Sequence, residues 1–275
     1  MVADLHIHST YSDGSYLPEE IIIKAQNKGL NTIALTDHDT VAGIEDALKY
    51  GKKYGITVIP GIEFSTYEGK TEIHILGYYI NHQNQQLIDK TRKLLKMRIN
   101  RAKKMVKLLN EQGINITYEQ VKTIAGDKYV GRPHIARALI EKGYIKEIGE
   151  AFSEKYIGNG GRAYVPRHKL TSRQTIAIIK KAHGIPVLAH PYFINHGEPL
   201  KKDYIARLIV MGLKGIEVFH SKHGVEVSKF YEKIARELGL IITGGSDFHG
   251  ENSPGVELGD VVVEDDLVRE LRKIW

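Results

Sequence analysis

Short apolar segments alternate with amphipathic stretches along most of this chain. The apolar segments have the length of strands and are rich in β-branched residues, which fit a pleated sheet. They predict strands at Ala3–Ile7, Thr32–Leu35, Thr57–Ile62, Glu72–Tyr78, Pro186–Ala189, Gly215–Phe219 and Leu240–Thr243. Because strands that alternate with helices usually pair in parallel through crossover connections, we expect an α/β fold with parallel strands.

The amphipathic stretches carry residues that are typical of helix boundaries. Pro18, followed by two glutamates, indicates the first turn of a helix. Thr40 is expected to cap a helix over Val41–Lys53, and Ser172 a helix over Arg173–Ala182.

The alternation stops between about Gln83 and Tyr164, where the pattern is almost wholly helical. Helices are expected there at Gln86–Gln112, Tyr118–Ile124, His134–Lys142 and Lys146–Tyr156. No long linker flanks this region. The sequence therefore predicts a barrel domain of residues 1–82 and 165–275, with residues 83–164 forming an α-helical insertion.

Histidines and carboxylates stand within or directly after the predicted strands. The segments are Asp4-Leu5-His6-Ile7-His8, Thr36-Asp37-His38-Asp39, Gly61-Ile62-Glu63, Glu72-Ile73-His74, Ala189-His190-Pro191 and Ser246-Asp247-Phe248-His249, with Asp13 in a turn after the first. Side chains two apart on a strand share a face, so His6 projects with His8, and Asp247 with His249. Such pairs chelate metals, and burying so many polar groups without partners is costly. We therefore expect a cluster of two or three metal ions.

The spread of these residues over several strands also favours one fold over another. An open doubly wound sheet places its site at a single switch point. A barrel gathers side chains from the C-terminal ends of many strands. We therefore expect a closed or distorted β/α barrel that carries the helical insertion.

Composition restricts the protein class. The chain has 275 residues, 42% of them hydrophobic, and no cysteine, so disulfides and thiolate ligands are excluded and any metal must bind His and carboxylate groups. The N-terminus does not resemble a signal peptide, and no apolar run approaches the roughly 20 residues of a membrane span. We expect a cytoplasmic protein without an obligate protein partner.

The net charge of +6 is unevenly distributed. From Lys90 to Lys107 the chain has nine basic residues and no acidic one. Such a stretch can contact the phosphates of a nucleic acid. It can equally form the solvated face of a helix, and the absence of interleaved aromatic residues favours that alternative.

Hydrolysis by metal-bound hydroxide is the chemistry that these residues predict. Bridging metals lower the pKa of bound water and hold the attacking and leaving oxygens. Neither a nucleophile elbow nor a glycine-rich phosphate loop occurs in the sequence. In Gly131-Arg132-Pro133-His134 the Arg132 guanidinium suits phosphate oxygens, although it equally fits a surface arginine at a helix start. Several cations near Arg132 favour an anionic substrate, hence a phosphate ester.

The ordered motifs His-x-His, Thr-Asp-His, Gly-Ile-Glu, Ala-His-Pro and Ser-Asp-x-His, from Leu5 to His249, resemble those of the PHP (polymerase and histidinol phosphatase) family. The resemblance implies a distorted (β/α)7 barrel and a metal-dependent phosphoesterase. By this resemblance, with Glu63 bridging, the ligands of the three ions are His6, His8, Glu63 and Asp247; Asp13, His38 and His249; and Glu63, His74 and His190. Asp13 stands where some relatives have His, and Asp37 and Asp39 are expected to orient imidazoles. Mn²⁺ is the favoured ion, with Fe²⁺, Zn²⁺ and Mg²⁺ as alternatives.

The Gly-Arg-Pro-His segment resembles the branch that includes nucleoside 3′,5′-bisphosphate phosphatases and a 5′→3′ exoribonuclease of short RNA. This resemblance implies that the insertion caps the site and that Arg132, His134 and His220 bind substrate phosphate, with His168 as a weaker candidate. Asp247, His249 and His220 would support the bound hydroxide, unless His220 is an exposed loop residue. The implied substrate is a phosphorylated nucleotide or a short 5′-phosphorylated oligonucleotide. A histidinol-phosphate-type phosphatase, a metal-dependent amidohydrolase and a non-catalytic PHP scaffold are the alternatives.

Overall fold

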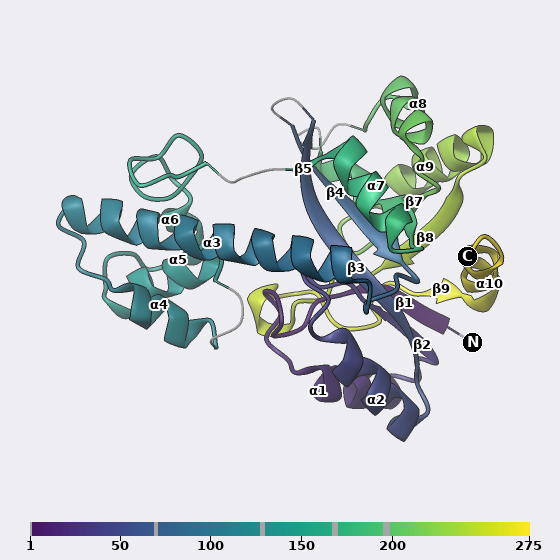
Figure 1. Ribbon diagram of the computed structural model, residues 1–275, viewed down its shortest axis with the longest axis horizontal. Helices are drawn as coiled ribbons and strands as arrows, with labels where there is room; N and C mark the ends of the chain where they lie inside the picture. The colour runs from purple at the N-terminus through teal and green to yellow at the C-terminus, as the bar shows by residue number, and fades with distance from the viewer. Residues whose placement is uncertain (1, 69–70, 127–129, 167–169, 195–198) are drawn as a thin grey trace. The chain divides into compact units, whose positions relative to one another are not determined.

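The chain forms two compact units in a computed structural model that describes residues 2–68, 71–126, 130–166, 170–194 and 199–275 (Figure 1). The barrel unit comprises Met1–Thr91 and Lys169–Trp275, and the helical unit comprises Arg92–His168. Helix α3 (Gln85–Glu111) begins in the barrel unit and ends in the helical unit. The insertion boundaries expected at residues 83 and 164 remain a prediction. Among the described helices, none combines the length and the apolar character that crossing a membrane requires.

One sheet organises the barrel unit, with its described strands in the order β8-β7-β6-β4-β3-β2-β1-β9 and β5 beside β3. All seven predicted strands are present, and β3 extends six residues farther than expected. The strands are β1 (Val2–Ile7), β2 (Thr32–Leu35), β3 (Thr57–Glu68), β4 (Thr71–Tyr78), β5 (Leu170–Thr171), β6 (Ile185–Leu188), β7 (Gly215–His220), β8 (Ile241–Gly245) and β9 (Val263–Glu264).

Backbone hydrogen bonds between β1 and the segment after β8 nearly close this sheet into a barrel. The His8 N–H donates to the Phe248 carbonyl at 2.9 Å, and the Phe248 N–H donates to the His6 carbonyl at 3.3 Å. Gly245 permits this approach, because a Cβ at that position would lie 2.4 Å from the backbone nitrogen of His6. The expected distorted β/α barrel is confirmed.

The expectation that the strands are parallel is wrong for β4, and β9, which the sequence did not predict, is also antiparallel. Strand β4 pairs antiparallel with both β3 and β6, and β9 pairs antiparallel with β1. Only two residues separate β3 from β4 in the sequence. A parallel pair needs a crossover of about a dozen residues, so this connection permits only a hairpin.

Six α-helices of the described chain lie wholly within the barrel unit: α1 (Pro18–Asn27), α2 (Ile44–Tyr54), α7 (Ser172–Lys181), α8 (Lys202–Met211), α9 (Val225–Leu238) and α10 (Asp265–Lys273). Two expected helix starts are wrong. Helix α2 begins at Ile44 instead of Val41, because the Thr40 hydroxyl accepts from the Ala42 N–H in a preceding turn. Thr171 caps α7, since its hydroxyl accepts from the Gln174 N–H at 3.2 Å and Ser172 is already helical.

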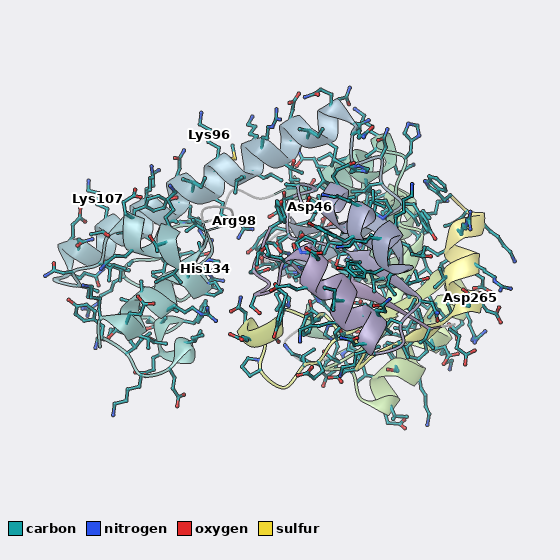
Figure 2. The ribbon with its side chains drawn as sticks, turned by 90° about the horizontal axis from the view of Figure 1, so that it is seen from below. Asp46, Lys96, Arg98, Lys107, His134 and Asp265 are labelled. Carbon is teal, nitrogen blue, oxygen red and sulfur yellow. The ribbon has the colours of Figure 1, made fainter. Side chains whose placement is uncertain are left out.

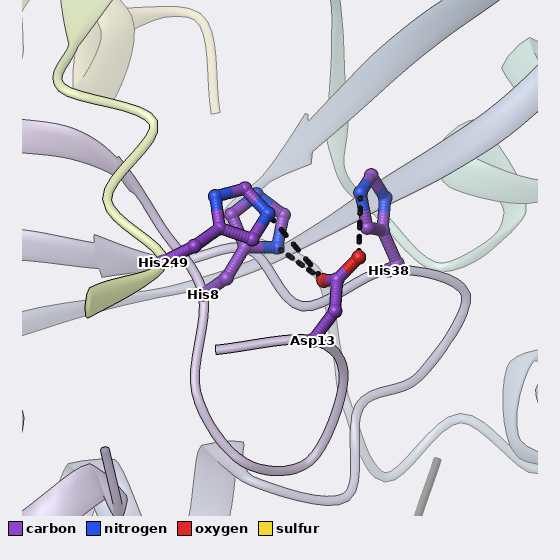
Figure 3. A group of neighbouring side chains, drawn as sticks. All are labelled: His8, Asp13, His38 and His249. Carbon is purple, nitrogen blue, oxygen red and sulfur yellow. Dashed lines mark ion pairs between the residues drawn. The ribbon is translucent and has the colours of Figure 1, made fainter. Parts of the chain in front are cut away.

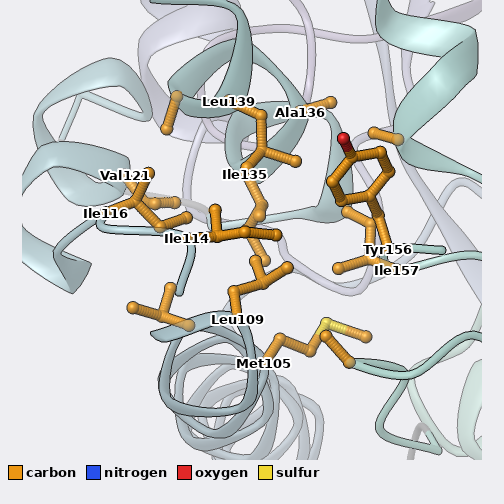
Figure 4. Packing of buried hydrophobic residues seen from close by; sticks show 14 of the residues in the cluster. Met105, Leu109, Ile114, Ile116, Val121, Ile135, Ala136, Leu139, Tyr156 and Ile157 are labelled. Atoms are coloured by element: carbon orange, nitrogen blue, oxygen red, sulfur yellow. The ribbon is translucent and has the colours of Figure 1, made fainter. Parts of the chain in front are cut away.

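The helical unit contains most of α3 together with α4 (Tyr118–Ile124), α5 (Arg132–Glu141) and α6 (Ile148–Ala151). These helices bury a separate apolar core (Figure 4), in which Leu109 and Leu139 are fully buried. Full burial of such a side chain contributes about 1.5–3 kcal/mol. The long helix expected over Lys146–Tyr156 is wrong, because the chain turns after Ala151 and Gly158 approaches the Phe152 carbonyl too closely for any side chain.

Candidate metal centre

The nine residues predicted as metal ligands converge at one end of the barrel. Most lie at or just beyond the C-terminal ends of parallel strands, as the barrel architecture requires. His74 lies in the first half of β4, opposite Ser65 of β3. Because β4 runs antiparallel, its first half reaches the same end of the barrel as the C-terminal ends of the others.

The first group combines two imidazoles with two carboxylates, and three of its four side chains are almost fully buried. The Nε2 atoms of His6 and His8 lie 3.4 and 3.3 Å from Glu63 Oε2. The same two nitrogens lie 3.4 and 3.3 Å from Asp247 Oδ1. One ligand atom from each of the four residues lies within 4.8 Å of the others, so one ion can contact all four.

The second group surrounds Asp13 (Figure 3). Asp13 Oδ1 lies 3.4 Å from His249 Nε2 and 3.8 Å from His8 Nδ1, and Asp13 Oδ2 lies 3.8 Å from His38 Nε2. The structure thus adds His8 to the expected set of Asp13, His38 and His249. The two nitrogens of the His8 ring face different groups.

Glu63 lies at the centre of the third group. Its Oε1 atom lies 2.8 Å from His74 Nδ1 and 2.9 Å from His190 Nε2. Its Oε2 atom lies 3.0 Å from His38 Nδ1. A single carboxylate therefore contacts imidazoles of all three groups, as its expected bridging role requires.

The unsatisfied atoms of this cluster test whether its residues fit metal ions. In the part of the chain that is described, His6 Nε2, His8 Nε2, His38 Nδ1, Asp13 Oδ1 and Glu63 Oε2 are buried and have no hydrogen-bond partner. Buried polar atoms are nearly always bonded, because leaving one unpaired costs about 1–3 kcal/mol. Imidazole and carboxylate atoms are preferred ligands of divalent transition metals, so the residues fit such ions.

The electrostatics of the cluster follow from its buried carboxylates. Burial lowers the pKa of the His8 ring, but the nearby carboxylates of Asp247 and Glu63 more than offset this and raise the pKa to about 10. Burial likewise lowers the pKa of His74, while the Glu63 charge raises it to about 10. Burial raises the pKa of Glu63, yet the charges on His38, His74 and His6 hold it well below its ordinary value. The carboxylates are therefore ionised at neutral pH, and these imidazoles must release protons to bind a metal.

Comparison with known proteins agrees with this geometry. Residues 4–180 match the family model described as the PHP domain. The chain belongs to the PHP family. It is 33% identical to a 5′-3′ exoribonuclease of Haemophilus influenzae, across 99% of this chain and 97% of that protein. It is 30% identical to a 3′,5′-nucleoside bisphosphate phosphatase of Chromobacterium violaceum, across 99% of this chain and 94% of that protein.

A crystal structure from Bifidobacterium adolescentis, described as a metal-dependent phosphoesterase, has a TM-score of 0.87 to this PHP protein at 31% identity. The match covers 98% of this chain and 94% of that chain. The family resemblance inferred from the motifs is confirmed. The PHP cluster of His, Asp and Glu side chains is compatible with metal binding.

Two carboxylates that the sequence analysis did not assign support the PHP cluster from behind. Glu217 on β7 is fully buried, and its Oε1 atom accepts from His6 Nδ1 at 2.9 Å. Asp4 on β1 accepts from the Ser246 hydroxyl at 2.6 Å and from the Gly259 N–H at 3.0 Å. Burial raises the pKa of Asp4 to about 6 despite these hydrogen bonds. The sequence signal that could have identified both residues is an acidic side chain within an otherwise apolar strand.

The expected role of Asp37 requires revision, and that of Asp39 remains a prediction. Asp37 accepts from the Ser9 N–H at 2.7 Å and from the hydroxyls of Ser9 and Ser12 at 2.7 and 2.6 Å. Of these two serines only Ser12 contacts an imidazole, since its hydroxyl lies 3.5 Å from His8 Nδ1. Asp39 accepts from the Ser65 N–H at 3.3 Å. Asp37 therefore holds the loop that carries the ligands and does not orient a ring directly.

Of the non-glycine residues with positive φ angles in the described chain, three lie in the loops that carry the predicted ligands. The values are 54° for Asp39, 23° for His190 and 58° for Asp247. Such conformations cost about 1–3 kcal/mol each and persist where surrounding contacts enforce them. Two of these residues are predicted ligands, so the fold maintains backbone strain to aim their side chains.

His220 joins the cluster, and the alternative of an exposed loop histidine is wrong. It is 3% exposed, and its Nε2 atom lies 3.4 Å from Asp247 Oδ2. Its Nδ1 atom accepts from the Lys222 N–H at 3.1 Å, so in the neutral ring the proton resides on Nε2. An imidazole in this state donates a hydrogen bond and does not bind a metal through that nitrogen.

The other residues predicted to bind substrate lie in the helical unit. Arg132 Nη1 lies 3.4 Å from Asn159 Oδ1, and its guanidinium lies 5.1 Å from the centroid of the Phe152 ring. His134 Nδ1 accepts from the Gly131 N–H at 3.0 Å, so this ring caps the start of α5. His168 lies outside the described residues. A role of Arg132 and His134 toward substrate remains a prediction.

Proposed function

We propose that this PHP protein is a metal-dependent phosphoesterase that hydrolyses phosphate esters of nucleotides or of short 5′-phosphorylated oligonucleotides. The observation that carries the proposal is the buried cluster of six imidazoles and three carboxylates at one end of the barrel. The chain belongs to the PHP family and is similar to a phosphatase and an exoribonuclease, which supports nucleotides and oligonucleotides as the substrate class. No cysteine is present in the sequence to act as a nucleophile.

The cluster has room for two or three divalent ions. His6, His8, Glu63 and Asp247 would hold the first, and Asp13, His38 and His249, together with His8, the second. Glu63, His74 and His190 would hold the third, with His38 alongside. Mn²⁺ is our favoured ion, and sites of this composition also accept Fe²⁺, Zn²⁺ and Mg²⁺.

When bound, the cations polarise phosphoryl oxygens and lower the pKa of water. The chain's own residues would hold the ions in place and exclude bulk water. Glu63, Asp247 and Asp13 would hold the negative charge that fixes the ions, and the burial of Glu63 keeps bulk water away from its carboxylate. His220 presents a protonated Nε2 beside Asp247 and can donate to a phosphate or leaving-group oxygen. Arg132 and His134 are our candidates for phosphate contacts from the helical unit.

The charge of the helical unit supports an oligonucleotide as a second substrate form. Residues 92–168 contain seventeen Lys or Arg residues against seven Asp or Glu residues. On α3, Lys96, Lys103 and Lys107 are exposed and are spaced seven and four residues apart, which places them on one helical face. Figure 2 shows Lys96 and Lys107 on one side of α3 and Arg98 on the other. A face of this kind suits successive phosphates of a strand.

Product analysis tests the proposal directly. The purified protein is incubated with adenosine 3′,5′-bisphosphate, a 5′-phosphorylated RNA oligonucleotide, histidinol phosphate and an amide ester analogue, with and without Mn²⁺. We expect release of phosphate or mononucleotide only in the presence of metal. Cleavage of the amide alone, or turnover that survives complete removal of metal, would overturn it.

A further inference from the structure

Glu217 links two ligands that come from distant strands. Its Oε1 atom lies 2.9 Å from Nδ1 of His6 on β1, and its Oε2 atom accepts from the backbone N–H of His190 at 2.8 Å. Glu217 is fully buried on β7, and His6 is equally buried. Both oxygens of this carboxylate are thus committed to the cluster.

We propose that Glu217 is a positioning residue that fixes the metal-binding state of His6 and, at the same time, the backbone of His190. The carboxylate accepts from His6 Nδ1–H, which leaves the lone pair of Nε2 directed at Glu63 and Asp247. The inference rests on the proposed metal-dependent function. It extends that function by naming the residue that positions one ligand of the first group and one of the third.

The contact with His190 explains its unusual backbone. His190 has a φ of 23°, a value that non-glycine residues rarely adopt. The hydrogen bond from its N–H to Glu217 holds the peptide in this conformation, and the side chain then reaches Glu63 with Nε2 at 2.9 Å. Glu217 therefore contacts a member of the first ligand group and a member of the third.

An amide cannot replace this carboxylate even though its shape is the same. Both partners of Glu217 are donors, and the N–H of His190 has no alternative state. Gln offers one acceptor oxygen and one donor NH₂ group. If its oxygen accepts from His190, its NH₂ faces His6 and favours the tautomer with the proton on Nε2. That tautomer has no lone pair for a metal at Nε2.

The experiment compares Glu217→Gln with a matched control that loses a buried hydrogen bond elsewhere in the barrel. Tyr231→Phe removes the hydroxyl that accepts from the Leu200 N–H at 2.8 Å, a hydrogen bond between two buried residues, neither of which is a predicted ligand. Mn²⁺ binding by the metal-free proteins is measured calorimetrically without substrate, and the thermal midpoint is recorded for each variant.

Glu217→Gln is expected to weaken Mn²⁺ binding by about 10–100-fold, the usual effect of losing a partner behind a metal ligand. Excess Mn²⁺ should restore most of its turnover. Tyr231→Phe should lower the thermal midpoint but bind Mn²⁺ like the wild type.

Wild-type Mn²⁺ affinity in Glu217→Gln, or a loss of turnover that excess Mn²⁺ does not restore, would overturn the inference. Failure of the proposed function gives a different result. In that case the wild-type protein binds Mn²⁺ and the variant weakens it, but neither hydrolyses a phosphate ester.

Discussion

The two units of this PHP protein place their charged groups in opposite ways. The barrel unit buries ionisable residues in its interior, and outside residues 92–168 the chain has twenty-two Lys or Arg residues against twenty-six Asp or Glu residues. The helical unit has an apolar interior and an excess of basic residues (Figure 4). Buried charges interact strongly because little solvent screens them, whereas exposed charges are screened within about 10 Å. Substitutions in the two units should therefore differ in size and in kind.

The largest effect is expected from the centre of the barrel cluster. Glu63→Gln removes the charge shared by imidazoles of all three ligand groups, and we expect turnover to fall by several orders of magnitude with loss of bound metal. Metal content by elemental analysis and phosphate release are the measurements. Glu232→Gln, which breaks an exposed pair with Arg236, is the control and should change neither. Normal metal content in Glu63→Gln would contradict the assignment of a shared ligand.

Metal binding to the barrel cluster should depend steeply on pH. Carboxylate contacts raise the pKa values of His8 and His74 to about 10, so both rings are protonated at neutral pH before a metal binds. Each proton released makes the apparent affinity rise about tenfold per pH unit below that pKa. Calorimetry in buffers of different ionisation enthalpy counts these protons between pH 6 and 8. An affinity that does not change across this range would contradict the electrostatic picture.

A smaller effect is expected from the helical unit. Arg132→Ala should lose charge-assisted hydrogen bonds worth about 1.5–3 kcal/mol. Steady-state kinetics on adenosine 3′,5′-bisphosphate should show this mainly as a higher KM, with metal content unchanged. Arg162→Ala removes another exposed cation of the same unit and serves as the control. Equal kinetics in the two variants would show that Arg132 does not bind the substrate phosphate.

The smallest effect on small substrates is expected from the exposed face of α3. Charge reversal at Lys96, Lys103 and Lys107 should leave hydrolysis of adenosine 3′,5′-bisphosphate nearly unchanged. It should weaken oligonucleotide binding and flatten its salt dependence, because each lost phosphate contact lowers the slope. Fluorescence anisotropy at several salt concentrations measures both.

A triple reversal at Lys229, Lys233 and Lys273 changes the charge of the barrel unit by the same amount and is the control. Equal oligonucleotide binding by the two triple variants would make the α3 face a solvated surface only.

The sequence predicted the barrel well because its signals were local. Most of the predicted strands were short and apolar, and most candidate ligands stood at or just after a strand end, where the fold gathers side chains. The reversal of β4 was missed because hairpin and crossover connections cannot be distinguished by apolar pattern alone. The irregular chain after Ala151 was missed because its turns depend on the packing of Gly158.

The residues behind the ligands were harder to predict. Glu217 and Asp4 lie on strands whose partners are distant in the sequence, so no spacing rule connects them to His6 or Ser246. His220 was placed correctly at a strand end, but the tautomer of its neutral ring depends on the Lys222 N–H. Such details arise from tertiary contacts and become visible only in the folded chain.

The seam between β1 and the segment after β8 has a consequence for how the protein is made. His6 and His8 leave the ribosome first, but their backbone partner Phe248 and the ligands Asp247 and His249 emerge about 240 residues later. A nascent chain therefore carries His6 and His8 until Asp247 and His249 are synthesised without the carboxylate and imidazole that complete their sites. The first two ligand groups can bind their metals only after His249 has been synthesised, and a chain that terminates before Gly245 cannot complete either group.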